Sequence, residues 1–131
     1  MNKDAIVYED LSSEQLTEEG CFIWQNWGLP ADKSLSIARA RLAPGMSTRW
    51  HRLSGVREIY LLTAGRGRVE LGGRKPAEVA AGDLVNIPAG TDQRITNLGS
   101  GDLIFYCVCT PAFTPACYSD MEGAGAEKEE S

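Results

Sequence analysis

GMSTRWHRLSGVREIYLLTAG, residues 45–65, is the stretch that decides the fold. It holds two predicted strands, STRWHRL and REIYLLTA, and the chain's single histidine, His51, with Glu58 seven residues later. Because side chains alternate between the faces of a strand, Arg49 and His51 are expected to share one face of the first strand. Glu58 and Tyr60 are expected to share one face of the second. If both faces line one cavity, an imidazole, a carboxylate, a guanidinium and a phenol meet there, which predicts a site without naming its reaction.

Similar segments continue on both sides of this stretch. Short β-rich runs arrive about every eight to twelve residues, separated by glycine, proline or asparagine. They are LSIARARL, GRVELGG, AEVAAGD, LVNIPAG, DQRITN and DLIFYCVC. No helical periodicity of comparable strength occurs in the chain. The pattern predicts an all-β sandwich or barrel, in which the nearly continuous apolar run at residues 103–109 is a central strand.

The N-terminal part, residues 1–34, is predicted to contain strands and an edge or dimer segment. AIVYED is strand-like, and LSSEQLTEEG favours one helical turn capped by Ser12 or Ser13. Glu18 and Glu19, near the end of that segment, are expected to lie in solvent.

The segment CFIWQNWG follows and is dense in aromatic residues. Trp24 and Trp27 lie so close together that they favour either core packing or burial at an interface. Pairing of this strand across a two-fold axis would cover an otherwise exposed sheet edge. A homodimer is therefore expected.

The barrel is predicted at residues 35–111, and residues 112–131 are predicted to form a lid segment and an acidic tail. AFTPACYSDME holds Phe113, Cys117 and Tyr118 among two prolines, a composition suited to crossing a barrel mouth. GAGAEKEES has no apolar residue larger than alanine and is predicted to be solvated.

The composition fits one domain, because domains most often contain roughly 100 to 150 residues and this chain has 131. Its 13 Lys and Arg against 18 Asp and Glu form no basic cluster, which argues against nucleic acid as a partner. The N-terminus lacks the apolar stretch of a secretory signal, and no apolar run approaches the roughly 18 residues of a membrane span. We therefore expect a soluble cytoplasmic protein with no membrane partner, whose four cysteines are reduced thiols.

Two spaced sets of residues resemble the signature of the cupin superfamily. The first family motif, G-x5-H-x-H-x4-E-x6-G, is matched by Gly45, His51, Glu58 and Gly65, with Leu53 in place of the second histidine. The second, G-x5-P-x-G-x2-H-x3-N, is matched by Gly82, Pro88, Gly90 and Asn97, with Gln93 in place of its histidine. The resemblance covers roughly residues 35–110 and implies a cupin jelly roll, also called a double-stranded β-helix barrel.

Metal-binding cupins hold a divalent ion with three histidines and the glutamate, so the resemblance implies a Zn, Mn, Fe or Ni site. Carried over by position, the metal ligands here are His51, Glu58 and Gln93. Leu53 cannot coordinate a metal, and the amide oxygen of Gln93 is a weaker ligand than imidazole. Alternatively, Gln93 hydrogen-bonds His51 or Glu58 and holds it in place.

Four further positions have two interpretations each. Arg49 is expected either to grip a substrate carboxylate or phosphate, or to form a salt bridge with Glu58. Tyr60 is a candidate for substrate binding and proton transfer, or it packs in the core. Cys107 and Cys109 share one strand face; they either reach the cavity, where a thiolate would favour zinc, or fill the core.

The leading hypothesis is a small cupin that binds a divalent metal ion and acts on a small polar or carboxylate-bearing molecule, as an oxygenase, isomerase or lyase of the cupin type. Glu58 and Tyr60 are its candidate catalytic residues, since both can move protons. Two alternatives stay open: a binding or sensing cupin that has lost its metal, and a metal-free acid–base enzyme that uses His51 and Glu58. Fold alone does not decide among them.

Overall fold

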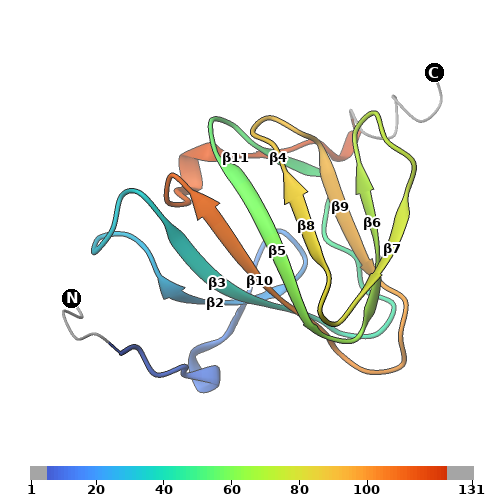
Figure 1. Ribbon diagram of the computed structural model, residues 1–131, viewed down its shortest axis with the longest axis horizontal. Coiled ribbons are helices and arrows are strands. Elements are labelled where there is room, and N and C mark those ends of the chain that lie inside the picture. The colour runs from blue at the N-terminus through green and yellow to red at the C-terminus, as the bar shows by residue number, and fades with distance from the viewer. Residues whose placement is uncertain (1–5, 124–131) are drawn as a thin grey trace.

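A computed structural model of the protein describes residues 6–123, which form two antiparallel sheets facing each other (Figure 1). The six-stranded sheet has the order β1 (Gln15–Leu16), β2 (Phe22–Trp27), β3 (Ser36–Leu42), β10 (Leu103–Thr110), β5 (Arg57–Ala64) and β8 (Leu84–Ile87). The five-stranded sheet has the order β11 (Tyr118–Asp120), β4 (His51–Leu53), β9 (Gln93–Asn97), β6 (Arg66–Leu71) and β7 (Ala77–Ala80). Two short 3-10 helices, η1 (Leu11–Ser13) and η2 (Pro115–Cys117), complete the structure. The predicted all-β double-stranded β-helix is confirmed.

Strand β10 is central, as its apolar composition predicts. It pairs with β3 on one side and with β5 on the other. The register aligns Cys109 with Glu58 on β5 and with Ser36 on β3. Since directly opposed residues project to the same face, these three side chains form one row across the sheet. That row lies on the face of the six-stranded sheet that is turned toward the five-stranded sheet.

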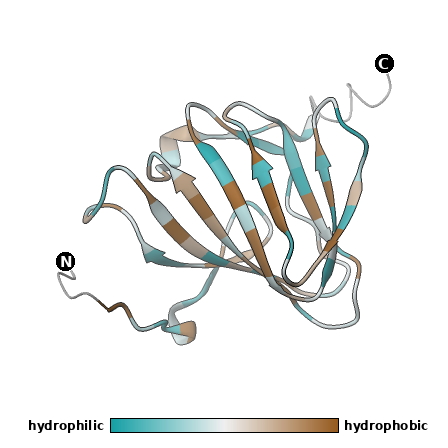
Figure 2. Cartoon of the chain, in the orientation of Figure 1, coloured by the Kyte–Doolittle hydropathy of each residue, from teal (hydrophilic) through white to brown (hydrophobic). Residues whose placement is uncertain are grey.

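The hydrophobic core lies between the sheets and is built from alternating positions of their strands. On β5, for example, Glu58, Tyr60 and Leu62 are buried, while their neighbours in the strand are less buried. Figure 2 shows the hydrophobic residues concentrated within the strands. The most deeply buried large side chains include Phe105, Leu42, Ile87, Ile95 and Leu103. This core occupies the space between the sheets next to the polar row of Ser36, Cys109 and Glu58.

Two motif residues have structural roles that explain their identity. Gly65 has a φ of +86°, and a Cβ there would lie 2.7 Å from the carbonyl oxygen of Asp102, so any other residue would clash and be strained. Asn97 is buried, and its side-chain amide donates to the carbonyl oxygens of Leu42 and Gly101, at 2.9 and 2.8 Å. Both residues therefore fix turns that connect the two sheets.

The N-terminal segment departs from the prediction. Residues 6–10 form no strand, and Asp10 rather than Ser12 or Ser13 caps the helical turn, because its carboxylate accepts hydrogen bonds from the Ser12 amide and from both serine hydroxyls. The turn is followed by the short strand β1, which pairs with the start of β2.

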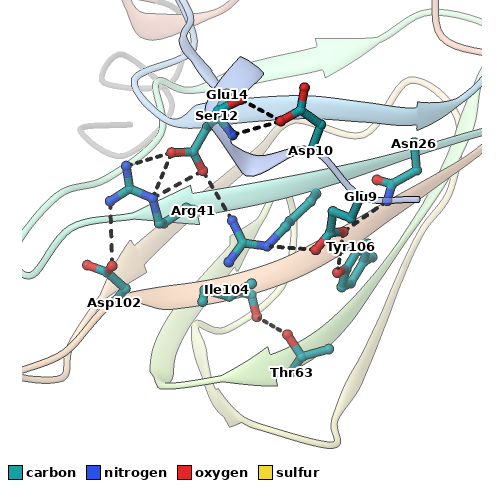
Figure 3. A network of polar contacts seen from close by, with 11 residues as sticks. Glu9, Asp10, Ser12, Glu14, Asn26, Arg41, Thr63, Asp102, Ile104 and Tyr106 are labelled. Atoms are coloured by element: carbon teal, nitrogen blue, oxygen red, sulfur yellow. Dashed lines mark hydrogen bonds and ion pairs between the residues drawn. The ribbon is translucent and has the colours of Figure 1, made fainter. Parts of the chain in front are cut away.

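Carboxylates attach this segment to the outer face of the six-stranded sheet (Figure 3). Glu14 pairs with Arg41 at 2.7 Å and with Arg39 at 3.2 Å. Glu9 accepts hydrogen bonds from the hydroxyl of Tyr106 at 2.6 Å and from the side chain of Asn26 at 3.0 Å. The hydrogen bonds and ion pairs hold the N-terminal segment against β2, β3 and β10.

The C-terminal segment crosses from one sheet to the other. After β10 it passes through Phe113 and η2, and then β11 pairs with β4 at the edge of the five-stranded sheet. The predicted acidic tail lies, apart from Gly123, outside the described residues. Within residues 6–123, no helix is long and apolar enough to cross a membrane.

Candidate functional site

A cavity of about 190 Å³ lies beside the core, against the motif residues. It is lined by Thr17, Glu19, Ile23, Gln25, Ser36, Ala38, His51, Leu53, Glu58, Cys107, Cys109 and Phe113. These residues come from the N-terminal segment, from four strands of the six-stranded sheet, from β4 and from the C-terminal crossing. The cavity therefore brings together segments that are far apart in the sequence.

Glu58 is the most unusual residue in the cavity wall, because it is only 7% exposed and has no cationic partner among the described ion pairs. The thiol of Cys109 donates to its Oε2 over 3.6 Å, while its Oε1 is buried and has no hydrogen-bond partner in the described part of the chain. Burial raises the pKa of Glu58 to about 7, although the nearby polar groups of Gln93 and the two cysteines oppose the increase. This carboxyl group can thus exist in both protonation states near neutral pH.

His51 lies at the start of β4 and is 2% exposed. Its Nδ1 is 2.7 Å from the backbone carbonyl oxygen of Arg49, to which it donates, and its ring stacks on Tyr118 with centroids 5.3 Å apart. Because Nδ1 holds the proton, Nε2 is left as a hydrogen-bond acceptor. Burial lowers the pKa of His51, which favours this neutral form. His51 and Glu58, both predicted as site residues, line the same cavity.

Gln93 and Tyr60 lie behind the cavity wall instead of lining it. Gln93 is opposite His51 in the pairing of β9 with β4, and its side-chain oxygen accepts a hydrogen bond from the Tyr60 hydroxyl. Tyr60 packs on Phe105 with ring centroids 4.6 Å apart, and burial raises its pKa well above the ordinary value of 10.0. With its oxygen engaged by Tyr60, Gln93 is better placed to orient Glu58 than to bind a metal.

Arg49 lies outside the cavity. Strand β4 begins only at His51, so Arg49 does not continue the alternation of that strand. Its side chain is about half exposed and pairs with Asp120, with Nε 2.6 Å from Oδ2. The expected salt bridge with Glu58 is therefore not formed.

Glu19 is a cavity residue that sequence reasoning placed in solvent. Its backbone oxygen accepts a hydrogen bond from the Arg49 amide at 2.8 Å, which ties its loop to the strand that carries His51. The side chain lines the cavity, and burial together with the charge of Glu58 raises its pKa to about 7. The polar run LSSEQLTEEG carries no local signal of this burial, which depends on a contact with residues about thirty positions away.

Leu53 and the cysteines complete the wall. Leu53 is buried and packs with Val56, Cys109 and Cys117 in a small apolar cluster. Cys107 and Cys109 reach the cavity, and burial raises the pKa of both thiols. All four cysteines are free. The two cavity cysteines are thus neutral thiols and not the thiolates that zinc prefers.

These residues do not fit the metal site that the resemblance implies. Across residues 6–123, no group of three or more His, Cys, Asp or Glu side chains is placed to hold a metal ion. Leu53 supplies no donor, and the oxygen of Gln93 is occupied by Tyr60. Of the predicted ligands, His51 and Glu58 remain, and two protein ligands are fewer than the three that catalytic zinc sites use.

A barrel of two antiparallel sheets around a lined cavity defines the double-stranded β-helix class. Within that class, the cupin domain family Cupin_2 matches residues 38–109, more than half of the chain. The chain belongs to this family.

Relatives with more specific descriptions match part of the chain. The oxalate-binding protein of Thermotoga maritima is 35% identical over 77 residues, 59% of this chain and 63% of that protein. A predicted oxalate decarboxylase from the same organism has a crystal structure that is 30% identical, covers 70% of this chain and 80% of that chain, and gives a TM-score of 0.64. The crystal structure of a Cupin 2 conserved barrel domain protein from Salinispora arenicola is 21% identical in sequence. The match covers 97% of this chain and 99% of that chain, with a TM-score of 0.70. The chain spans less than two thirds of the length of the curated relatives it matches.

Proposed function

We propose that this cupin binds a small molecule in the cavity and that Glu58 and His51 move a proton on it, as in isomerisation or elimination. The observation that carries the proposal is the Glu58 carboxyl group, buried in the cavity wall with one oxygen that has no partner. Buried polar groups are normally satisfied, so an unpartnered oxygen at a cavity suggests that a ligand satisfies it.

The two side chains suit opposite halves of a proton transfer. The raised pKa of Glu58, about 7, leaves a protonated carboxyl group available as an acid at neutral pH. Neutral His51, with Nδ1 held by the Arg49 carbonyl, offers Nε2 as a base. Because the best catalytic acid or base has a pKa near the working pH, the Glu58 carboxyl group is adapted to proton transfer at neutral pH.

A divalent metal ion is the second candidate occupant of the same place. The unpartnered oxygen of Glu58 and the Nε2 of His51 favour it, and so does the family. Since the donor set is incomplete, we derive no reaction step from a metal. The test is elemental analysis of protein purified without chelator, before and after incubation with Zn²⁺, Mn²⁺, Fe²⁺ or Ni²⁺. About one metal ion per chain in the wild type, lost when His51 is replaced, would support the metal ion over the metal-free proposal.

Oxalate is the ligand suggested by the names of the two Thermotoga maritima relatives. The cavity offers little to support it, because the twelve lining residues include no Lys or Arg. The predicted role of Arg49 in gripping a substrate carboxylate requires its side chain to leave Asp120.

A homodimer through the aromatic strand β2 stays a prediction. It is supported by the short length of β1, which pairs only with Phe22 and Ile23 and leaves the rest of that edge without a strand among the described residues. Elution as a monomer at micromolar concentration would contradict it.

The test of the proposed function uses a carbon acid as a probe. Cyclohexanone in D₂O exchanges its α-protons slowly, and the protein is expected to accelerate this exchange. Glu58→Gln should abolish the acceleration while it preserves the shape of the wall. Glu78→Gln, a change at an exposed residue of β7 paired with Arg66, is the matched control and should retain full activity. In parallel, ¹³C NMR should show the Glu58 carboxyl carbon titrating near pH 7; titration near 4.5 would contradict the acid–base role.

A further inference from the structure

Above pH 7, where the carboxyl groups of Glu58 and Glu19 ionise, the charges around the cavity are of one sign. Glu58 and Glu19 both line it, and among the described lining residues there is no Lys or Arg. An adjoining pocket shares Thr17, Glu19 and Phe113 with the cavity, and Glu18 lines it as well. An anionic ligand such as oxalate would meet like charges in both pockets, and neither pocket has a Lys or Arg among its described lining residues.

The acceptors in the cavity match the donors of one chemical group. Glu58, Glu19 and His51 all line one small space, and their ionised carboxylates and the imidazole Nε2 can serve as three acceptor sites. Among residues 6–123, no hydrogen-bond partner reaches the Oε1 atom of Glu58. A protonated primary amine has three N–H donors and one positive charge, so it can satisfy all three acceptors at once.

The apolar part of the wall determines the body of the ligand. Ile23, Ala38, Leu53 and Phe113 line it, and the volume of about 190 Å³ accommodates a compact group of a few carbon atoms. Burial of such a group contributes roughly 25 cal/mol for each Å² of apolar surface removed from water. The amine supplies orientation and the apolar body supplies most of the affinity.

We propose that the cavity selects a small primary ammonium ligand with a compact apolar body and rejects carboxylates, oxalate included. This inference rests on the proposed small-molecule function and names its ligand class. It gives Glu19, which has no counterpart among the predicted site residues, a direct role in binding. The position of Leu53, where the family motif has a histidine, then provides apolar surface for the body of the ligand.

The experiment is a titration of ¹⁵N-labelled protein at pH 8, where an alkyl amine is still protonated. The probes are cyclohexylammonium, cyclohexanol, cyclohexanecarboxylate and oxalate, with n-butylammonium and n-butanol as a slimmer pair. The Kd values are obtained from the chemical-shift changes of cavity residues. The Kd of the tighter-binding ammonium probe should be at least tenfold lower than the Kd of the alcohol with the same carbon skeleton. The two carboxylates should cause no shift at the same concentrations.

Variants separate this selectivity from general binding. Glu58→Gln and Glu19→Gln should each weaken ammonium binding about tenfold or more and leave alcohol binding within twofold, while Glu78→Gln changes neither. If Glu58→Gln does not fold, Glu19→Gln, in a surface loop, still decides the question. Alcohols or carboxylates that bind in the cavity as tightly as the amines would overturn the inference and leave the proposed function standing. If no probe shifts the cavity residues, both are overturned.

Discussion

Replacing Glu58 with glutamine is expected to stabilise the protein at alkaline pH and to leave its stability in acid almost unchanged. In the folded protein the pKa of Glu58 is raised from 4.5 to about 7, chiefly by burial. The folded state therefore holds this proton more tightly than the unfolded state. The resulting stabilisation is complete below pH 4.5 and is lost as the pH rises through about 7. Glutamine removes this loss because it stays neutral at every pH.

The size of the effect follows from the two pKa values. They differ by about 2.5, and each pKa unit corresponds to about 1.4 kcal/mol, so the charged carboxylate costs about 3 kcal/mol of stability at pH 8. Glu19 shares this cavity, and its pKa is raised partly by the charge of Glu58. The Glu19→Gln/Glu58→Gln double variant should consequently show a non-additive gain at pH 8.

Urea denaturation of the wild type and of Glu58→Gln, from pH 4.5 to pH 8, measures the difference in the free energy of unfolding. The difference should rise by about 3 kcal/mol over that interval, with most of the increase between pH 5 and pH 7. For Glu78→Gln, at an exposed position, the difference in the free energy of unfolding from the wild type should not change with pH. A difference for Glu58→Gln that stays within about 0.5 kcal/mol at every pH would refute the claim that this carboxyl group is buried at a cost.

Two further changes probe the scaffold and the edge of the site. Asn97→Ala should destabilise the protein by about 2 kcal/mol in urea denaturation, because the buried carbonyl oxygen of Leu42 and the partly buried one of Gly101 lose their donor. A loss below about 0.5 kcal/mol would contradict this role. Arg49→Ala should leave the affinity for cavity ligands within twofold by NMR titration, since its side chain pairs with Asp120 outside the cavity. A tenfold loss would restore Arg49 as a ligand-binding residue.

The fold was predictable from spacing, because Gly65 and Asn97 stand where the backbone permits few alternatives. Gly65 has a positive φ and close backbone neighbours, and the Asn97 side chain bridges two carbonyl groups. Such local requirements leave a signature in one sequence. The meeting of His51 and Glu58 was predictable for the same reason, since strand alternation and the motif both place them inward.

The rest of the site depends on contacts that no local pattern encodes. Arg49 leaves the expected face because a bend at Trp50 precedes β4. Glu19 enters the cavity because its loop hydrogen-bonds to the Arg49 amide, although its own segment looks fully solvated. The choice between two roles for Gln93 could not be made from the sequence, since it depends on the Tyr60 hydroxyl. In each case a partner distant in the chain overrides the local preference.

The central position of β10 has a kinetic consequence. This strand pairs with β3, which lies about sixty residues earlier, and it supplies Cys107 and Cys109 to the cavity wall. During synthesis, His51 and Glu58 leave the ribosome before β10 (Leu103–Thr110) does, so for that interval Glu58 is hydrated and ionises as an ordinary carboxylate. Long-range strand pairing is slow, with folding times of roughly milliseconds to seconds for proteins of this kind. Below pH 7, Glu58 therefore takes up its proton late, in the same step that closes the barrel. Above pH 7 that step buries the ionised carboxylate, so folding there should be slower in the wild type than in Glu58→Gln.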